Sequence, residues 1–178
     1  MLYTDERLGQ KGDGLVRAGD LLLHVPKVLA GEDIDLAMGK LTRIVTPSPE
    51  RVDAFCQHYD RCGGCKFQHW AEAPYQAWKR NLLVEALAAQ NISTEVTPLV
   101  DAHGAGRRRV SLHVREVDGA WAAGFMEQKS HDLIALDYCP VLVSALKQAA
   151  QLAAAFGPAL GACDVAITAA DNGLDVSI

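Results

Sequence analysis

The stretch that decides how this chain is interpreted runs from Cys56 to His69 and reads CQHYDRCGGCKFQH. Its three cysteines, Cys56, Cys62 and Cys65, are separated by five and two residues. The two glycines between the last pair allow backbone conformations in which amides turn toward a bound sulfur. Three thiolates on one loop can hold one face of a metal centre, and Cys139, which precedes a proline, is the candidate fourth ligand. We therefore predict a metal site made by these four cysteines.

Two kinds of metal fit this pattern. A tight group of cysteines with a distant Cys-Pro is typical of iron-sulfur ligation and favours a [4Fe-4S] cluster. Structural zinc more often uses two C-x-x-C pairs, or one pair with two histidines, so His58 and His69 keep zinc open. Burial as ordinary apolar thiols fits poorly, because three cysteines lie within ten residues. Cys163 lies in an alternating strand pattern, and we interpret it as a packing residue.

The composition indicates a globular protein. Of the 178 residues, 49% are hydrophobic and 22% are charged, which excludes the disordered, collagen-like and coiled-coil classes. There is no run of eighteen apolar residues and no signal sequence at the start, so we expect a cytoplasmic protein without membrane association. The net charge of -5 lacks the basic signature of many nucleic-acid binders. Any RNA contact therefore has to be local.

The sequence predicts an α+β, β-rich fold in three parts. Residues 1–46 contain short apolar stretches divided by glycine turns, which is typical of a small OB-like β-barrel. Pro47 and Pro49 interrupt any regular element and mark a boundary. Residues 47–92 then hold the cysteine loop and a helix, and residues 93–178 form a central domain of β-hairpins and a helix.

Within these parts, hydrophobic spacing and turn residues locate individual elements. A helix is expected from Pro74 to about Asn91, and a hairpin turning at Asp118-Gly119 is expected after it. A third strand over Asp132 to Asp137, a helix over Ser144 to Phe156 and a second hairpin over Asp164 to Ile178 follow. Because the chain stops inside an apparent strand, we expect the central domain to be partial.

The residues around the cysteines carry a family resemblance. The loop, together with Ser48-Pro49-Glu50-Arg51 and Gln68-His69, resembles the iron-sulfur motif of the bacterial RNA uracil-C5 methyltransferases, especially the large-subunit ribosomal RNA branch. The residues from Gly9 to Gly14 are similar to the start of that family's RNA-binding TRAM domain. The stretch from Gly124 to Glu127 and the sequence Asp137-Tyr138-Cys139-Pro140 resemble the region that supplies its fourth cluster cysteine.

The resemblance implies that Cys56, Cys62, Cys65 and Cys139 ligate a [4Fe-4S] cluster. It also implies a parent enzyme that uses S-adenosylmethionine to methylate uracil in RNA, and ribosomal RNA is the expected partner. The family's glycine-rich cofactor loop and its nucleophilic cysteine are not recognisable in this sequence, so no catalytic residue is assigned. We expect this chain to be the N-terminal part of such an enzyme, monomeric and inactive by itself.

Four arginines and one tryptophan are the candidate RNA contacts. Arg107, Arg108, Arg109 and Arg115 could neutralise phosphates, a contribution that weakens with salt. Trp70, beside the cysteine loop, could stack on a base. The alternative for the arginines is a solvated strand edge, where charge discourages aggregation. The family resemblance favours RNA.

Two other function classes stay open at the level of sequence. The first is an electron-transfer or redox-sensing iron-sulfur protein, which cluster chemistry alone permits. The second is a zinc-stabilised binding module, because His58 and His69 lie near the cysteines. Metal and sulfide content distinguishes the zinc module from the two iron-sulfur alternatives.

Overall fold

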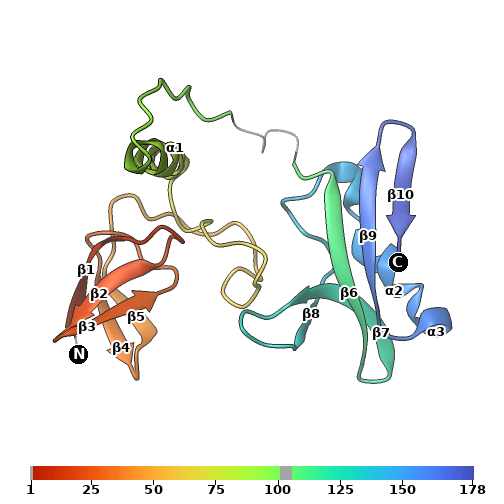
Figure 1. Cartoon of the computed structure of the whole chain (residues 1–178). Coiled ribbons are helices and arrows are strands. Elements are labelled where there is room, and N and C mark those ends of the chain that lie inside the picture. Colours follow the sequence, from red (N-terminus) through yellow and green to blue (C-terminus); the bar gives the residue numbers. More distant parts are fainter. Residues whose placement is uncertain (1, 101–105) are drawn as a thin grey trace. The chain divides into compact units, whose positions relative to one another are not determined.

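The computed structural model describes residues 2–100 and 106–178, which form two compact units (Figure 1). The first unit contains the chain up to Ala54 and then Lys66–Val100. The second contains Phe55–Cys65 and the described residues from Gly106 onward. The three loop cysteines thus belong to the second unit, although the end of the loop from Lys66 and the segments on both sides of it belong to the first. The predicted division of the chain into three domains, with boundaries after residues 46 and 92, stays a prediction.

A five-stranded antiparallel sheet forms most of the first unit. Its strands are β1 (Leu2–Leu8), β2 (Gly14–Ala18), β3 (Leu21–Val25), β4 (Asp33–Ala37) and β5 (Lys40–Thr46), in the order β3-β2-β1-β4-β5. The buried side chains of Val16, Val25, Val28 and Ile34 make its core. Among the described residues no pairing joins β3 to β5, so the predicted barrel is not closed.

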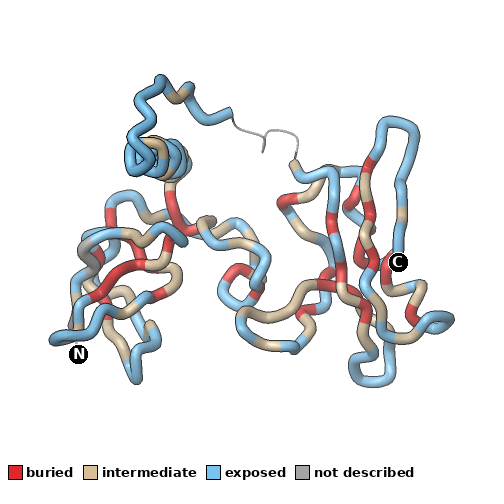
Figure 2. Tube along the Cα trace, in the orientation of Figure 1, coloured by how far each residue is buried: buried red, intermediate tan, exposed pale blue. Residues whose placement is uncertain are grey.

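The helix predicted after the cysteine loop is confirmed as α1 (Glu72–Ala89). It begins two residues before Pro74, in keeping with the tolerance of proline in a first helical turn. None of its residues is fully buried, as Figure 2 shows by the absence of red along this helix. Within the described residues, no helix has the length and apolarity needed to cross a membrane.

The second unit is built on another five-stranded antiparallel sheet. Its strands are β6 (Arg109–Val117), β7 (Ala120–Met126), β8 (Leu133–Ala135), β9 (Cys163–Ala170) and β10 (Gly173–Ser177), in the order β10-β9-β6-β7-β8. Both predicted hairpins and the third strand are therefore confirmed. Asp118 and Gly119 have φ angles of 51° and 79°, the left-handed pair that a two-residue hairpin turn requires.

Alternation along β6 decides which face of this sheet is covered. Val110, Leu112 and Val114 are buried, whereas Arg109 and Ser111 are exposed, because successive side chains of a strand point to opposite faces. Helix α2 (Ala149–Ala154) packs on β6 and β7 over the buried side. The α+β, β-rich class predicted from the sequence is thus confirmed, with one helix-covered sheet face in this unit.

The prediction of a single helix over Ser144 to Phe156 is wrong in one respect. The structure divides it into a 3-10 turn, η1 (Ser144–Leu146), followed by α2, and Gly157 begins the short helix α3 (Gly157–Leu160) instead of ending a helix. Gln148 lies between η1 and α2 with a non-helical φ of -101° and ψ of 18°. Leu146 and three alanines of α2 are all buried, and this break lets both pieces face the core.

Candidate metal centre

The cysteine loop has a compact backbone of its own. The amide of Tyr59 donates to the carbonyl of Cys56 at 3.0 Å, and the amide of Cys62 donates to the carbonyl of His58 at 2.8 Å. Tyr59 itself is buried. The first two cysteines are therefore held by local hydrogen bonds, not by a regular helix or strand.

Backbone pairing attaches this loop to the end of β7. The amide of Gly63 donates to the carbonyl of Met126 at 3.2 Å, and the amide of Gln128 donates to the carbonyl of Arg61 at 2.9 Å. The guanidinium of Arg61 also makes two hydrogen bonds to the carboxylate of Glu127, at 3.1 and 3.3 Å. Cys62, which faces Glu127 in an isolated bridge, is thereby placed against the sheet of the second unit.

Cys139 reaches the same unit from the connection between β8 and η1. The carbonyl of Cys139 accepts a hydrogen bond from the amide of Leu142 at 3.1 Å, and this bond closes a tight turn around Pro140. The following residues are fastened to the chain ahead of β6, because the amide of Arg107 donates to the carbonyl of Val141 at 2.8 Å. The turn is thus fixed on one side by the sheet.

The four thiols lie in one electrostatic neighbourhood. Burial raises the pKa of the Cys139 thiol, and the charges of Cys65, Cys56 and Cys62 raise it further, while a hydrogen bond from the Val141 amide opposes them. Each loop cysteine is therefore close enough to Cys139 to act on it through its charge. All four belong to the second unit.

Backbone amides also point at two of the sulfurs. The Gly64 amide donates to the Sγ of Cys62 at 3.4 Å, and the Val141 amide donates to Cys139. Such amide-to-sulfur contacts stabilise thiolates and tune the metal centres that thiolates hold. The five cysteines of the chain form no disulfide bond.

This donor set fits a thiophilic metal, although the ligands are not assembled. Within residues 2–100 and 106–178, no three His, Cys, Asp or Glu side chains form a ready-made metal site. The four predicted ligands are nevertheless chemically uniform, because all of them are soft sulfur donors. Zinc and iron-sulfur clusters are the centres that such donors hold.

The two histidines that kept zinc open are placed differently. His58 lies in the cysteine loop, with its Nε2 3.3 Å from Nε2 of Gln57. His69 belongs to the first unit and its side chain is only 4% exposed. Burial, helped by the nearby positive charge of Arg51, lowers the pKa of His69 to about 4. Its imidazole is therefore neutral at neutral pH.

Cys163 has the packing role predicted for it. It begins β9, lies opposite Val114 of β6, and packs against the hydrophobic core of the second unit.

Two of the four predicted RNA-binding arginines are engaged by the sheet. Arg108 donates to the carbonyl of Ala169 at 2.9 Å and to the carboxylate of Asp171 at 2.6 Å. Arg115 donates to the carbonyls of Val114 at 2.7 Å and Cys163 at 3.1 Å. These contacts give both side chains a structural task in joining β6 to the β9 region.

The other two arginines have exposed side chains at the start of β6. Arg109 shares the uncovered face of the sheet with Ser111, and Arg107 lies just ahead of the strand. A pair that sequence reasoning missed lies further along this face, where the Nδ1 of His113 is 2.7 Å from the carboxylate of Asp164. His113 and Asp164 are brought together by the pairing of β6 with β9, so no local pattern in the sequence indicates the pair.

The structure places Trp70, the predicted base-stacking residue, in a packed position. Its side chain is only 8% exposed, and its indole N–H donates to the carboxylate of Glu50 at 2.8 Å. The ring packs among Phe67, Tyr75 and Trp78, with centroid distances of 5.5 to 6.3 Å. Little ring surface is left for a nucleotide.

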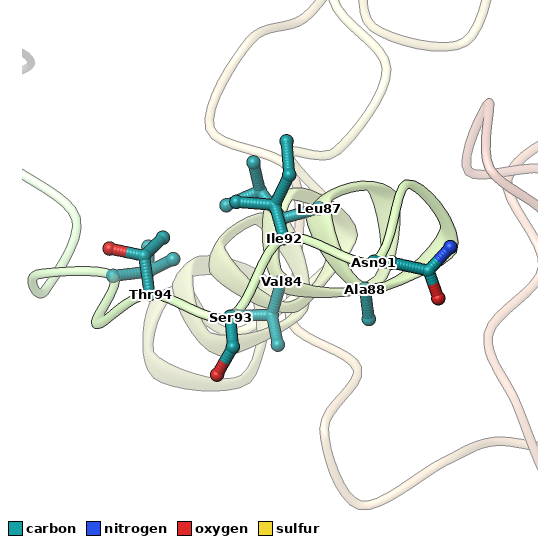
Figure 3. Close-up of a pocket in the computed structure, with 8 residues that line it drawn as sticks. Val84, Leu87, Ala88, Asn91, Ile92, Ser93 and Thr94 are labelled. Atoms are coloured by element: carbon teal, nitrogen blue, oxygen red, sulfur yellow. The ribbon is translucent and has the colours of Figure 1, made fainter.

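A hollow of about 370 Å³ lies at the C-terminal end of α1 (Figure 3). Its lining is mostly apolar, with Leu87 and Ile92 lying side by side in the close-up. The hollow contributes nothing to the metal centre, because none of its lining residues is charged or a cysteine. The lining residues are Val84, Leu87, Ala88, Asn91, Ile92, Ser93, Thr94 and Val96.

The second unit of this β-rich chain holds all five cysteines, four of which are the predicted metal ligands. Comparison with known proteins makes the assignment more specific, although no protein-family profile matches the chain. An uncharacterized RNA methyltransferase of Caulobacter vibrioides is 40% identical over 98% of this chain, and one of Brucella suis is 35% identical over 98%. The 23S rRNA (uracil(1939)-C(5))-methyltransferase RlmD of Methylococcus capsulatus is 32% identical over 82%.

The chain therefore belongs to this family of RNA methyltransferases, which confirms the resemblance noted in its sequence. It spans less than half the length of these relatives, namely 45%, 44% and 36%.

Proposed function

We propose that this chain is the RNA-recognition and [4Fe-4S]-binding part of an S-adenosylmethionine-dependent RNA uracil-C5 methyltransferase. The observation that carries the proposal is the close spacing of Cys56, Cys62 and Cys65 on one loop, whose charges act on the Cys139 thiol, in a chain similar to RNA methyltransferases. A bound cluster would connect the cysteine loop to the turn at Cys139 through iron-thiolate bonds.

The spacing of the cysteines, with a single C-x-x-C pair and a distant Cys-Pro, favours the cluster over zinc. The two amide-to-sulfur hydrogen bonds suit a centre whose bridging and ligand sulfurs carry negative charge. His69, the more distant histidine of the zinc alternative, belongs to the first unit. We assign the ligand roles to the four cysteines and none to a histidine.

For RNA, we propose Arg107 and Arg109 as the phosphate contacts. Both side chains are exposed, and Arg108 and Arg115 differ from them in donating hydrogen bonds to backbone carbonyls of the sheet region. Exposed guanidinium groups bind phosphate oxygens and act independently of base sequence. Ribosomal RNA is the proposed partner, since one named relative is a 23S rRNA methyltransferase.

The activity of the whole protein is part of the same proposal. The parent enzyme transfers a methyl group from S-adenosylmethionine to C5 of a uracil, and the cofactor site and catalytic residues lie outside this chain. The chain alone is inactive, monomeric and cytoplasmic. A methyl-transfer assay on the 178-residue chain with RNA and S-adenosylmethionine should give no product.

Metal analysis of anaerobically purified protein tests the metal half. We expect about four iron and four sulfide per chain, and serine at any one of the four cysteines should remove or halve them. Cys163→Ser is the matched control, because Cys163 packs against the core of the same unit and its replacement should leave the iron content unchanged. Zinc without sulfide would contradict the cluster and indicate a zinc-stabilised module instead.

RNA binding is tested separately. Titration of the chain with a 23S rRNA fragment that contains the uracil for which the relative is named should give saturable binding that weakens with salt. No binding at low salt would refute the recognition role while leaving the metal role intact. Reversible reduction of the cluster without any RNA binding would favour an electron-transfer protein.

A further inference from the structure

The cysteine loop is closed at its base by a small hydrogen-bonded neck, which we define as residues 50–52 and 69–71. The amide of Val52 donates to the carbonyl of His69 at 3.0 Å, and the amide of Ala71 donates to the carbonyl of Glu50 at 2.8 Å. Between them, Arg51 and Trp70 face each other in an antiparallel bridge. The neck belongs to the first unit and contains no cysteine.

A buried carboxylate anchors the incoming side of the neck. Glu32 is fully buried, and its carboxylate accepts hydrogen bonds from the guanidinium of Arg51 and from the amides of Leu29, at 2.8 Å, and Ser48, at 3.1 Å. Arg51 also donates to the carbonyl of Lys27 at 2.8 Å. Because so many donors hold this buried carboxylate, Glu32 fixes the position of Arg51 within the first unit.

Aromatic packing anchors the outgoing side. Phe67, Trp70, Tyr75 and Trp78 form a four-ring cluster, and the Phe67 ring lies against Gly12 of the turn between β1 and β2. A Cβ at Gly12 would lie 2.2 Å from the Phe67 ring, so the contact depends on that glycine. The two sides are then joined by the hydrogen bond from Trp70 to Glu50.

We infer that this neck presets the cysteine loop for its metal, with Glu32 and Arg51 as positioning residues that determine how firmly the loop cysteines hold it. The inference rests on the proposed metal-binding function. A loop whose ends are already joined has fewer conformations to lose when its cysteines are ligated, which favours retention of the metal. Residues of the first unit thereby control a centre whose ligands all belong to the second.

The test compares metal release from the 178-residue chain and its Glu32→Gln variant. Glutamine keeps the size of the side chain but removes the charge that holds Arg51. With iron and sulfide reconstituted, we expect the cluster to be lost to excess chelator about 10-fold faster, which corresponds to about 1.4 kcal/mol. Asp35→Asn is the matched control, because Asp35 makes an exposed ion pair with Arg43 in the same sheet. It should not change the rate.

Two further measurements separate positioning from general destabilisation. Glu32→Asp keeps the charge, so its metal release should be slower than that of Glu32→Gln. All release rates are measured at a temperature where circular dichroism shows that every variant is folded. Glu50→Gln weakens only the contact to Trp70 and should accelerate release to a smaller extent in the same direction. If Glu32→Gln does not fold, Glu50→Gln decides the question. Release at the control rate from a folded variant overturns the inference.

Trypsin gives a readout that needs no metal. Arg61 and Lys66 are exposed cleavage sites inside the closed loop. Trypsin cuts after them only when the loop backbone opens locally, and a loosened neck should make that opening more frequent. In metal-free protein we expect cleavage after Arg61 to be about 10-fold faster in Glu32→Gln than in Asp35→Asn. A chain that holds no metal at all refutes the proposed function. Equal cleavage rates in the two variants refute the role of the neck.

Discussion

The buried imidazole of His69 makes the first unit sensitive to acid. Burial and the charge of Arg51 lower its pKa to about 4, whereas the same group in the unfolded chain titrates near its ordinary value of 6.5. Between these two values the unfolded chain binds a proton that the folded chain does not. Stability from the neutral imidazole is therefore fully present above about pH 6.5 and is lost as the pH falls toward 4.

The size of the effect follows from the two pKa values. A difference of about 2.5 pKa units corresponds to about 3 kcal/mol when the loss is complete. About 2 kcal/mol of this is lost between pH 7 and pH 5, where carboxylates with ordinary or lowered pKa values stay ionised. Glu32 adds its own loss only at lower pH, because the hydrogen bonds from Arg51, Leu29 and Ser48 outweigh the effect of burial and hold its pKa below 4.5.

Urea unfolding of wild type and His69→Gln at pH 7, 6 and 5 measures this contribution. Tryptophan emission is a suitable probe, since two of the three tryptophans, Trp70 and Trp78, lie in the ring cluster beside the neck. We expect the free energy of unfolding of wild type to fall by about 2 kcal/mol more than that of the variant over this range. His24→Gln, at an exposed position in β3, should behave like wild type. Equal slopes for wild type and His69→Gln would refute the reasoning.

Four further substitutions follow from the packing and from the arginines near the start of β6. Gly12→Ala should destabilise the first unit by about 2 kcal/mol in urea unfolding, because its φ of 77° and the Phe67 ring both oppose a side chain. Leu112→Ala should lower the unfolding free energy of the second unit by about 3 kcal/mol, since it empties a fully buried site in β6. Arg109→Ala should reduce the salt dependence of RNA binding by about one unit of slope, while Arg108→Ala should leave that slope unchanged and lower the melting temperature.

The local elements were predictable because their causes are local. The hairpin at Asp118-Gly119 follows from two residues that tolerate left-handed backbone, and α1 follows from apolar spacing after a proline. The metal site proposed at the cysteine quartet was also predicted from local sequence, because metal ligation requires a short spacing between the thiols of a loop. The family resemblance depended on the same residues.

Contacts between distant segments were decided only by the tertiary structure. The pairing of β6 with β9 engages Arg108 and Arg115 and creates the pair of His113 with Asp164, none of which has a local signature. The break between η1 and α2 has the same origin, because burial of both pieces overrides the helix preference of an alanine-rich segment.

The neck shows the same division most clearly. The spacing of Glu32, Arg51 and His69 in the sequence predicts no contact, yet folding buries the carboxylate with its arginine and lowers the pKa of the imidazole to about 4. The sequence by itself determined which side chains can bind a metal, since that depends on residue type and short spacing. Only the tertiary structure decided how the loop that carries them is closed, because buried charges and packed rings obtain their energies from neighbours that are distant along the chain.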